Sequence, residues 1–143
     1  MSELLEKARS YEAKKIAATD KESKPLFHIS APAGWINDPN GFSVYNGKIH
    51  LFYQYYPYLR EWGPMHWGHS TTSDMIKWEQ LPCVLAPDEE YDKKGCFSGS
   101  AIEADGKHVL VYTGVTRIKL PDGSEQERQN QCIAFGDGLN YVK

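Results

Sequence analysis

The stretch Gly41-Phe-Ser-Val-Tyr-Asn-Gly-Lys-Ile-His-Leu-Phe-Tyr53 predicts two short strands around an Asn-Gly turn at residues 46–47. An Asn-Gly pair between alternating apolar and polar residues is the strongest short-range signal for a β-hairpin. The same design returns at residues 101–112, where Asp-Gly at 105–106 supplies the turn. Two such hairpins predict a chain built mainly from β-structure.

The two hairpins belong to a longer internal repeat. At an offset of 59 residues, Gly47-Lys48-x-x-Leu51-x-Tyr53 aligns with Gly106-Lys107-x-x-Leu110-x-Tyr112. At an offset of 63 residues, Asp74-x-x-x-Trp78 aligns with Asp137-x-x-x-Tyr141. Two units of about 60 residues, each with four predicted strands, are typical of consecutive blades of a β-propeller. The alternative interpretation is a chance pair of hairpins.

The number of blades raises a question about the whole protein. A propeller closes with at least about four blades, and the repeat supplies two. We therefore expect these residues to be the front of a longer protein, rather than a chain whose ring other chains complete. Two blades alone would leave strand edges unpaired, so we expect marginal stability or self-association. Residues 115–129 are predicted to form a polar loop between strands.

The N-terminal region has a helical pattern instead. Residues 2–19 predict one helix, with apolar residues at roughly helical spacing and Ser2 as a candidate N-cap. The charged stretch 20–25 ends in proline and is expected to break the helix. The predicted domain organisation is thus a helix with its linker over residues 1–25 and a partial β-propeller over residues 26–143.

Composition excludes several classes of function. The 143 residues carry 16 Lys and Arg against 19 Asp and Glu, a net charge of −3 that provides no basic surface for nucleic acid. No apolar run approaches the ~18 residues that a membrane span needs. The first ten residues mix both charge signs, unlike a secretory signal, and the three cysteines form no C-x-x-C pair. We expect a cytoplasmic protein with no nucleic-acid or membrane partner.

The segment Gly34-Trp-Ile-Asn-Asp-Pro-Asn-Gly41 is the most unusual in the chain. Pro39 favours an extended conformation for Asp38, and Pro-Asn-Gly is then expected to turn the backbone sharply. A carboxylate held beside two asparagines and an aromatic ring could be a positioned nucleophile. An ordinary turn with a local side-chain hydrogen bond is the alternative interpretation.

Three further segments follow in order: Leu51-Phe-Tyr-Gln-Tyr-Tyr-Pro57, Trp62-Gly-Pro-Met-His-Trp-Gly-His69 and Gly95-Cys-Phe-Ser-Gly-Ser-Ala101. Together with the first, they resemble the N-terminal half of glycoside hydrolase family 32, which includes invertases, sucrose-6-phosphate hydrolases, inulinases and levanases. The resemblance covers nearly everything from Phe27 to Lys143. It implies a five-bladed β-propeller followed by a β-sandwich, in agreement with the repeat. On this basis the chain is the N-terminal helix and first two blades, without the remaining blades and the sandwich.

The resemblance also implies roles for individual residues. Asp38 would be the nucleophile that attacks the anomeric carbon of a β-D-fructofuranosyl unit, in sucrose, sucrose 6-phosphate or the end of a fructan. Six other residues match positions that contact the fructosyl ring: Trp35, Asn37, Gln54, Trp62, Phe97 and Ser98. The set is chemically coherent, since amides and hydroxyls read sugar hydroxyls while aromatic walls exclude water.

The second carboxyl group of the reaction is missing from the motifs. A retaining glycosidase needs an acid/base carboxyl about 5 Å from the nucleophile. In family 32 this is a glutamate in an E-C motif, with an R-D-P aspartate that stabilises the transition state, and neither string occurs here. Solvated charges are the expected role of the later glutamates: Glu79, Glu89, Glu90, Glu103, Glu125 and Glu127. We therefore expect these 143 residues alone to be inactive.

No metal or other cofactor is predicted. His66 and His69 are three residues apart on a predicted strand and would point to opposite faces, which is poor geometry for chelation. The charged run at residues 88–94 is expected to be a solvated loop between blades. A place near the rim of the sugar pocket is the alternative, because the run precedes Phe97 and Ser98. No catalytic role is expected for Cys96.

Two other functions stay open at this point. The absence of E-C and R-D-P suits a non-catalytic module that binds fructosides or assembles with other chains. A related five-bladed furanosidase acting on arabinan or xylan is the third interpretation, against which the F-S-G-S-A and F-Y-Q-Y strings argue.

Overall fold

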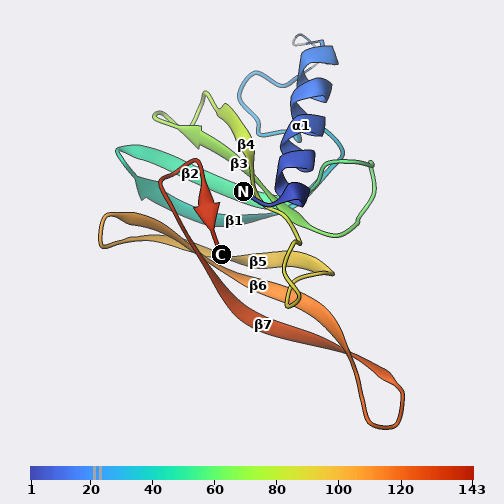
Figure 1. The fold of residues 1–143 in the computed structure, drawn as a ribbon. Coiled ribbons are helices and arrows are strands. Elements are labelled where there is room, and N and C mark those ends of the chain that lie inside the picture. The colour runs from blue at the N-terminus through green and yellow to red at the C-terminus, as the bar shows by residue number, and fades with distance from the viewer. Residues whose placement is uncertain (21, 23) are drawn as a thin grey trace.

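The computed structural model describes residues 1–20, 22 and 24–143, which form a helix and two antiparallel sheets (Figure 1). The elements are α1 (Glu3–Ala18), β1 (Trp35–Tyr45), β2 (Lys48–Tyr56), β3 (His66–Thr72), β4 (Glu79–Leu85), β5 (Gly95–Ala104), β6 (Lys107–Lys119), β7 (Glu125–Gly136) and β8 (Tyr141–Val142). The strand orders are β1-β2-β3-β4 and β5-β6-β7-β8. Each sheet is thus a four-stranded meander, and the expectation of two successive propeller blades after an N-terminal helix is confirmed.

The hairpin turns that mark the repeat have matching backbone geometry. Asn46 and Gly47 have φ values of 48° and 71°, and Asp105 and Gly106 have φ values of 51° and 71°. Positive φ at both central residues defines the type I′ turn, whose twist suits a two-residue hairpin. The turn pairs Tyr45 with Lys48 in the first blade and Ala104 with Lys107 in the second.

The second element of the repeat, at an offset of 63 residues, also has a structural counterpart. Asp74 Oδ1 accepts hydrogen bonds from the backbone N–H groups of Ile76 and Lys77, at 2.9 and 2.8 Å. Asp137 Oδ1 accepts in the same way from the residues two and three positions later, at 2.9 and 2.7 Å. Each aspartate therefore closes the turn that leads into the last strand of its blade.

The largest apolar core lies between the two sheets. Phe52, Trp67 and Leu85 of the first blade pack against Leu110 and Tyr112 of the second, and all five are buried. Leu110 and Tyr112 are the repeat residues of β6. The equivalent tyrosine of the first blade, Tyr53, lies instead in the second apolar cluster, together with α1.

Helix α1 covers the opposite face of the first sheet (Figure 1). Ser2 Oγ accepts a hydrogen bond from the N–H of Leu5 at 3.2 Å and caps the helix as expected. Leu5 and Ala8 are buried against Tyr53 and Tyr55. The expected break over residues 20–25 falls partly on residues 21 and 23, which lie outside the described residues. In the rest of the chain, no helix has the length and apolar character that a bilayer crossing requires.

The prediction of a polar loop over residues 115–129 is wrong. Strands β6 and β7 pair without interruption from Val115↔Gln129 to Lys119↔Glu125, and the loop is confined to residues 120–124. Figure 1 shows this hairpin extending beyond the rest of the second sheet. Strand pairing satisfies the backbone here, so exposed polar side chains, such as the Arg117–Glu125 pair at 3.4 Å, are compatible with β-structure.

Candidate active site

Asp38 lies in a β-bulge of β1, the first strand of the first blade. In the pairing of β1 with β2, Ile36 opposes Tyr55 and Pro39 opposes Tyr53. Two residues of β1, at positions 37 and 38, therefore face the single residue Gln54 of β2. The expected sharp turn at Pro-Asn-Gly is therefore wrong: the chain continues as a strand through Tyr45, with a second irregularity after Asn40. Bulges bend a strand and re-aim side chains, and they occur often beside active sites.

Ser98 lies in a bulge of β5, the first strand of the second blade. In the pairing of β5 with β6, Phe97 opposes Thr113 and Gly99 opposes Tyr112, which leaves Ser98 as the extra residue. The residue after each bulge faces the repeat tyrosine of its blade, Tyr112 here and Tyr53 in the first blade. Asp38 and Ser98 therefore occupy equivalent places in the two blades.

The two bulges face each other across the blade interface. Strands β1 and β5 are in contact, and Ser98 Oγ donates a hydrogen bond to Asp38 Oδ2 at 3.3 Å. In the described part of the chain, Ser98 is the one residue whose side chain hydrogen-bonds to Asp38. Both side chains are exposed, so the carboxylate is open to a ligand.

Three hydrogen bonds fix the start of β5 against the first blade. The Gln54 side-chain amide donates to the carbonyl of Cys96 at 3.0 Å, and the N–H of Cys96 donates to the carbonyl of Met65 at 2.8 Å. The Trp67 indole N–H donates to the carbonyl of Phe97 at 3.2 Å. Gln54 is buried. In the structure this predicted substrate contact holds the segment that carries Ser98.

Aromatic rings flank the bulges. Trp62 is 56% exposed and meets the ring of Phe97 edge to face, with centroids 6.0 Å apart. The Trp35 indole N–H donates to Asn37 Oδ1 at 2.8 Å, which orients the amide that precedes Asp38. Half-exposed rings beside hydroxyl and amide groups suit the binding of a sugar, which presents both apolar and hydroxyl faces.

No second carboxyl group is placed at Asp38 by the residues that the structure describes. All six later glutamates singled out from the sequence are exposed, as expected. The one buried glutamate is Glu12 of α1, whose Oε2 accepts from the N–H of Cys83 in β4 at 3.0 Å. Burial raises the pKa of Glu12 to about 7. This carboxyl group holds the helix against the sheet.

The histidines form internal hydrogen bonds. His66 Nδ1 lies 2.8 Å from the carbonyl of Pro64, and burial lowers the pKa of His66 to about 4. His69 Nε2 lies 2.9 Å from His50 Nδ1, within the blade interface. Among residues 1–20, 22 and 24–143, no group of three or more histidine, cysteine, aspartate or glutamate residues could hold a metal ion.

The expectation that residues 88–94 form a solvated loop is wrong in part. Asp92 is completely buried, and the side chain of Asp88 is only 12% exposed. Both contact the ammonium group of Lys143. The sequence motifs missed this cluster because its partner lies 51 residues further along the chain. The available signal was local: Asp92 and Gly95 have the spacing of a tight turn before a strand.

Comparisons with known proteins identify the family of this chain. The family model of the N-terminal domain of glycosyl hydrolases family 32 matches residues 28–143. Sucrose-6-phosphate hydrolase of Escherichia coli is 48% identical over 120 residues, which cover 83% of this chain and 25% of that protein. Levanase of Bacillus subtilis is 48% identical over 144 residues, which cover 98% of this chain and 21% of that protein. The chain therefore spans about a quarter of the length of these relatives.

Solved structures are similar over nearly the whole chain. A family 32 β-fructofuranosidase of Bombyx mori is 45% identical with a TM-score of 0.82, over 96% of this chain and 28% of that one. A variant of the same enzyme, solved in complex with sucrose, is 44% identical with the same TM-score. A sucrose-6-phosphate hydrolase of Lactobacillus gasseri is 34% identical with a TM-score of 0.73, over 98% of this chain and 27% of that one.

Proposed function

This chain belongs to glycosyl hydrolase family 32, and on that premise we propose that it is the N-terminal part of a retaining β-fructofuranosidase. Its substrates are sucrose, sucrose 6-phosphate or the terminal fructosyl units of fructans, and its place is the cytoplasm. Residues 1–25 form a helix with its linker, and residues 26–143 form the first part of the catalytic propeller. The observation that carries the proposal is the meeting of Asp38 with Ser98 at the equivalent bulges of two blades.

Asp38 is the nucleophile in this proposal. One of its carboxylate oxygens attacks the anomeric carbon of the fructosyl unit, and the bond from that carbon to the glycosidic oxygen breaks. The leaving alkoxide takes a proton from an acid/base carboxyl that residues outside this chain supply. The same group then removes a proton from water, which attacks the anomeric carbon and releases fructose and the free Asp38 carboxylate. The chain alone supplies one half of the catalytic pair and is inactive by itself.

Ser98 orients the nucleophile and contacts the substrate. Its hydroxyl donates to Oδ2, which leaves Oδ1 as the oxygen free to attack. The Asp38 side chain is exposed, so a substrate can reach the carboxylate, as a nucleophile requires. The relative that was solved with sucrose supports a carbohydrate ligand for this protein.

The side chains around the bulge define the fructosyl pocket. Trp35, Trp62 and Phe97 supply walls against which the apolar face of the sugar packs, and Asn37 and Gln54 supply amides for its hydroxyl groups. The walls also exclude water from the covalent intermediate until the leaving sugar has departed.

Product analysis tests this function. The complete protein, of which this chain is proposed to be the N-terminal part, is incubated with sucrose, sucrose 6-phosphate, levan and arabinan. We expect fructose, released as the β-anomer because two inversions retain the configuration. Release of arabinose or xylose without fructose would instead assign the chain to the related furanosidases.

A binding module without catalysis is the second candidate function, favoured by the absence of a second carboxyl group at Asp38 in the described residues. Titration calorimetry of the 143-residue chain with sucrose and kestose, together with light scattering, tests it. This candidate would be supported if the 143-residue chain binds a fructoside and the complete protein releases no fructose. Fructose release by the longer form would exclude it.

A further inference from the structure

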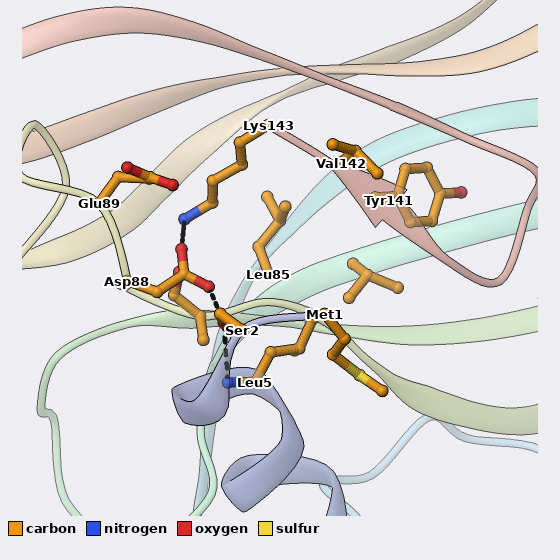
Figure 2. A pocket seen from close by; sticks show the side chains of 11 residues that line it. Met1, Ser2, Leu5, Leu85, Asp88, Glu89, Tyr141, Val142 and Lys143 are labelled. Atoms are coloured by element: carbon orange, nitrogen blue, oxygen red, sulfur yellow. Dashed lines mark hydrogen bonds and ion pairs between the residues drawn. The ribbon is translucent and has the colours of Figure 1, made fainter.

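A buried ion cluster lies where α1, the connection between the blades and the end of β8 meet (Figure 2). Lys143 Nζ lies 2.5 Å from Asp88 Oδ1 and 2.5 Å from Asp92 Oδ2, and it donates to the carbonyl of Ala86 at 2.5 Å. The side chain of Lys143 is 8% exposed and that of Asp92 is 0% exposed. Ser2 donates to the other carboxylate oxygen of Asp88, which joins the N-cap of α1 to the cluster.

Asp92 is the most heavily bonded member of this cluster. Besides Lys143, its Oδ2 accepts from the Tyr112 hydroxyl at 2.8 Å, and its Oδ1 accepts from the N–H of Glu89 at 2.8 Å. Its own carbonyl accepts from the N–H of Gly95 at 2.8 Å. Tyr112 is the residue that faces the bulge at Ser98. Asp92 therefore binds both the turn before β5 and the partner strand of the bulge.

The turn at Asp92 connects directly to the candidate site. Gly95 starts β5 and forms a bridge with Met65 of the first blade. A Cβ atom at Gly95 would lie 2.8 Å from the ring of Phe97 and 3.0 Å from the backbone nitrogen of Met65. The path of the chain from Asp92 to Ser98 therefore has little freedom, since backbone and ring are in close contact at its midpoint.

The electrostatics favour a fixed ammonium at this place. Burial acts to lower the pKa of Lys143, but Cys96 and the carboxyl groups of Asp88 and Asp92 outweigh that effect and raise it. A charged lysine that bonds two carboxylates and a carbonyl at once has one geometry available, because each of its three N–H groups has a partner.

We propose that Asp92, held by Lys143 and Tyr112, is a positioning residue that sets the start of β5 and so aims Phe97 and Ser98 at the substrate and at Asp38. The inference rests on the proposed fructofuranosidase function and deepens it. Asp92 touches neither the substrate nor the reacting atoms. It acts through the turn at Gly95 and through the strand opposite Ser98.

A double-mutant cycle in the complete enzyme separates this role from simple stabilisation. The variants are Asp92→Asn, Ser98→Ala and the double variant, and kcat/KM for sucrose is measured well below the unfolding temperature of each. If Asp92 acts through Ser98, the two effects are not additive. We expect each single variant to lose roughly tenfold in kcat/KM, and the double variant to lose much less than the roughly hundredfold that independent effects would give.

Two further variants keep the test decisive. Tyr112→Phe deletes one hydrogen bond to Asp92 without removing a charge, and it serves in the same cycle if Asp92→Asn does not fold. Asp105→Asn is the matched control, because it makes the same chemical change in the exposed turn at the opposite end of β5, where asparagine tolerates the positive φ. We expect it to leave kcat/KM unchanged.

The outcomes assign each failure to its cause. Losses that add in the cycle, or a cluster variant with unchanged kcat/KM, would overturn the positioning role while the proposed function stands. A complete wild-type enzyme that releases no fructose would instead overturn the proposed function. Losses that do not add, with a silent Asp105→Asn control, would support the inference.

Discussion

The hydroxyl of Ser98 donates to the carboxylate of Asp38 at 3.3 Å, across the boundary between two sheets and 60 residues of sequence. Each residue lies in a bulge of the first strand of its blade. It comes one position before the residue that opposes the repeat tyrosine, Tyr53 or Tyr112. A repeated fold thus presents two different functional groups at one repeated position. The candidate site depends on the blade interface as much as on either blade.

The first prediction concerns this hydrogen bond. Ser98→Ala removes the donor to Asp38 and should lower kcat/KM of the complete enzyme by about tenfold, the value of one hydrogen bond to a charged group. Ser100→Ala is the matched control, because Ser100 is exposed on the same strand. Steady-state kinetics with sucrose measures both. Equal effects of the two substitutions would show that the Ser98 hydroxyl has no special role.

The second prediction concerns the turns of the repeat. Gly106 has a φ of 71°, and no atom lies within 4 Å of a Cβ built there, so Gly106→Ala tests the backbone alone. We expect a loss of about 1–2 kcal/mol in the free energy of unfolding, measured by urea titration. Asp105→Asn in the same turn should change it by less than about 0.5 kcal/mol. An unchanged Gly106→Ala protein would contradict the type I′ assignment.

The third prediction concerns the buried carboxyl group of α1. Burial raises the pKa of Glu12 to about 7, above the value of 4.5 expected for an exposed glutamate. The folded protein therefore binds more protons than the unfolded chain between these values, and the contribution of Glu12 to stability is lost as the pH rises through 7. Glu12→Gln removes this dependence. Its stability relative to wild type should increase by about 3 kcal/mol between pH 4.5 and pH 8.

Urea titrations of both proteins across that range provide the measurement for Glu12. Glu6→Gln is the control, because Glu6 is exposed in the first turn of the same helix. Stability curves of wild type and Glu12→Gln that run parallel from pH 4.5 to pH 8 would contradict the raised pKa.

The fourth prediction concerns the histidines between the blades. His108 Nδ1 lies 2.7 Å from the Tyr141 hydroxyl and its Nε2 lies 2.9 Å from Ser43 Oγ. Burial, assisted by the charge of His50, lowers the pKa of His108 from 6.5 to about 4. The unfolded chain therefore binds the proton more readily. The stability that His108 contributes is complete above pH 6.5 and is lost as the pH falls toward 4.

His108→Gln tests this dependence, since an amide can replace both hydrogen bonds without titrating. The wild-type protein should lose about 3 kcal/mol more than the variant between pH 7 and pH 4. His28→Gln, at an exposed position before β1, is the control and should follow wild type. If His108→Gln loses as much stability as wild type on acidification, the buried histidine is not the cause.

The sequence predicts what local chemistry determines. The two hairpin turns and the capping serine of α1 act through neighbours within a few residues, and their structures follow the predictions. The sequence also aligns Asp74 with Asp137, and the structure shows that each closes an equivalent turn. The repeat predicts two sheets of four strands each, and the structure has them. The four ordered motifs likewise led to Asp38 and Ser98 as members of one site.

Long-range pairing explains what the sequence did not reveal. The polar composition of residues 115–129 predicts a loop, but β6 and β7 pair through most of this segment. The turn predicted at Pro-Asn-Gly is a strand in the structure, because Pro39 and Asn40 pair with the partner strand β2. Asp92 is buried only because Lys143 and Tyr112 reach it from distant strands. Each of these features depends on contacts that no local pattern encodes.

Replacement of Asp38 tests whether this residue is the nucleophile. Asp38→Asn keeps the size of the side chain and its hydrogen bond with Ser98 but removes the attacking carboxylate. Fructose release from sucrose by the complete enzyme should fall by at least about 10⁴-fold, while the folded structure and its unfolding midpoint stay close to wild type. A complete enzyme that turns over sucrose at a nearly normal rate with asparagine at this position would contradict the account.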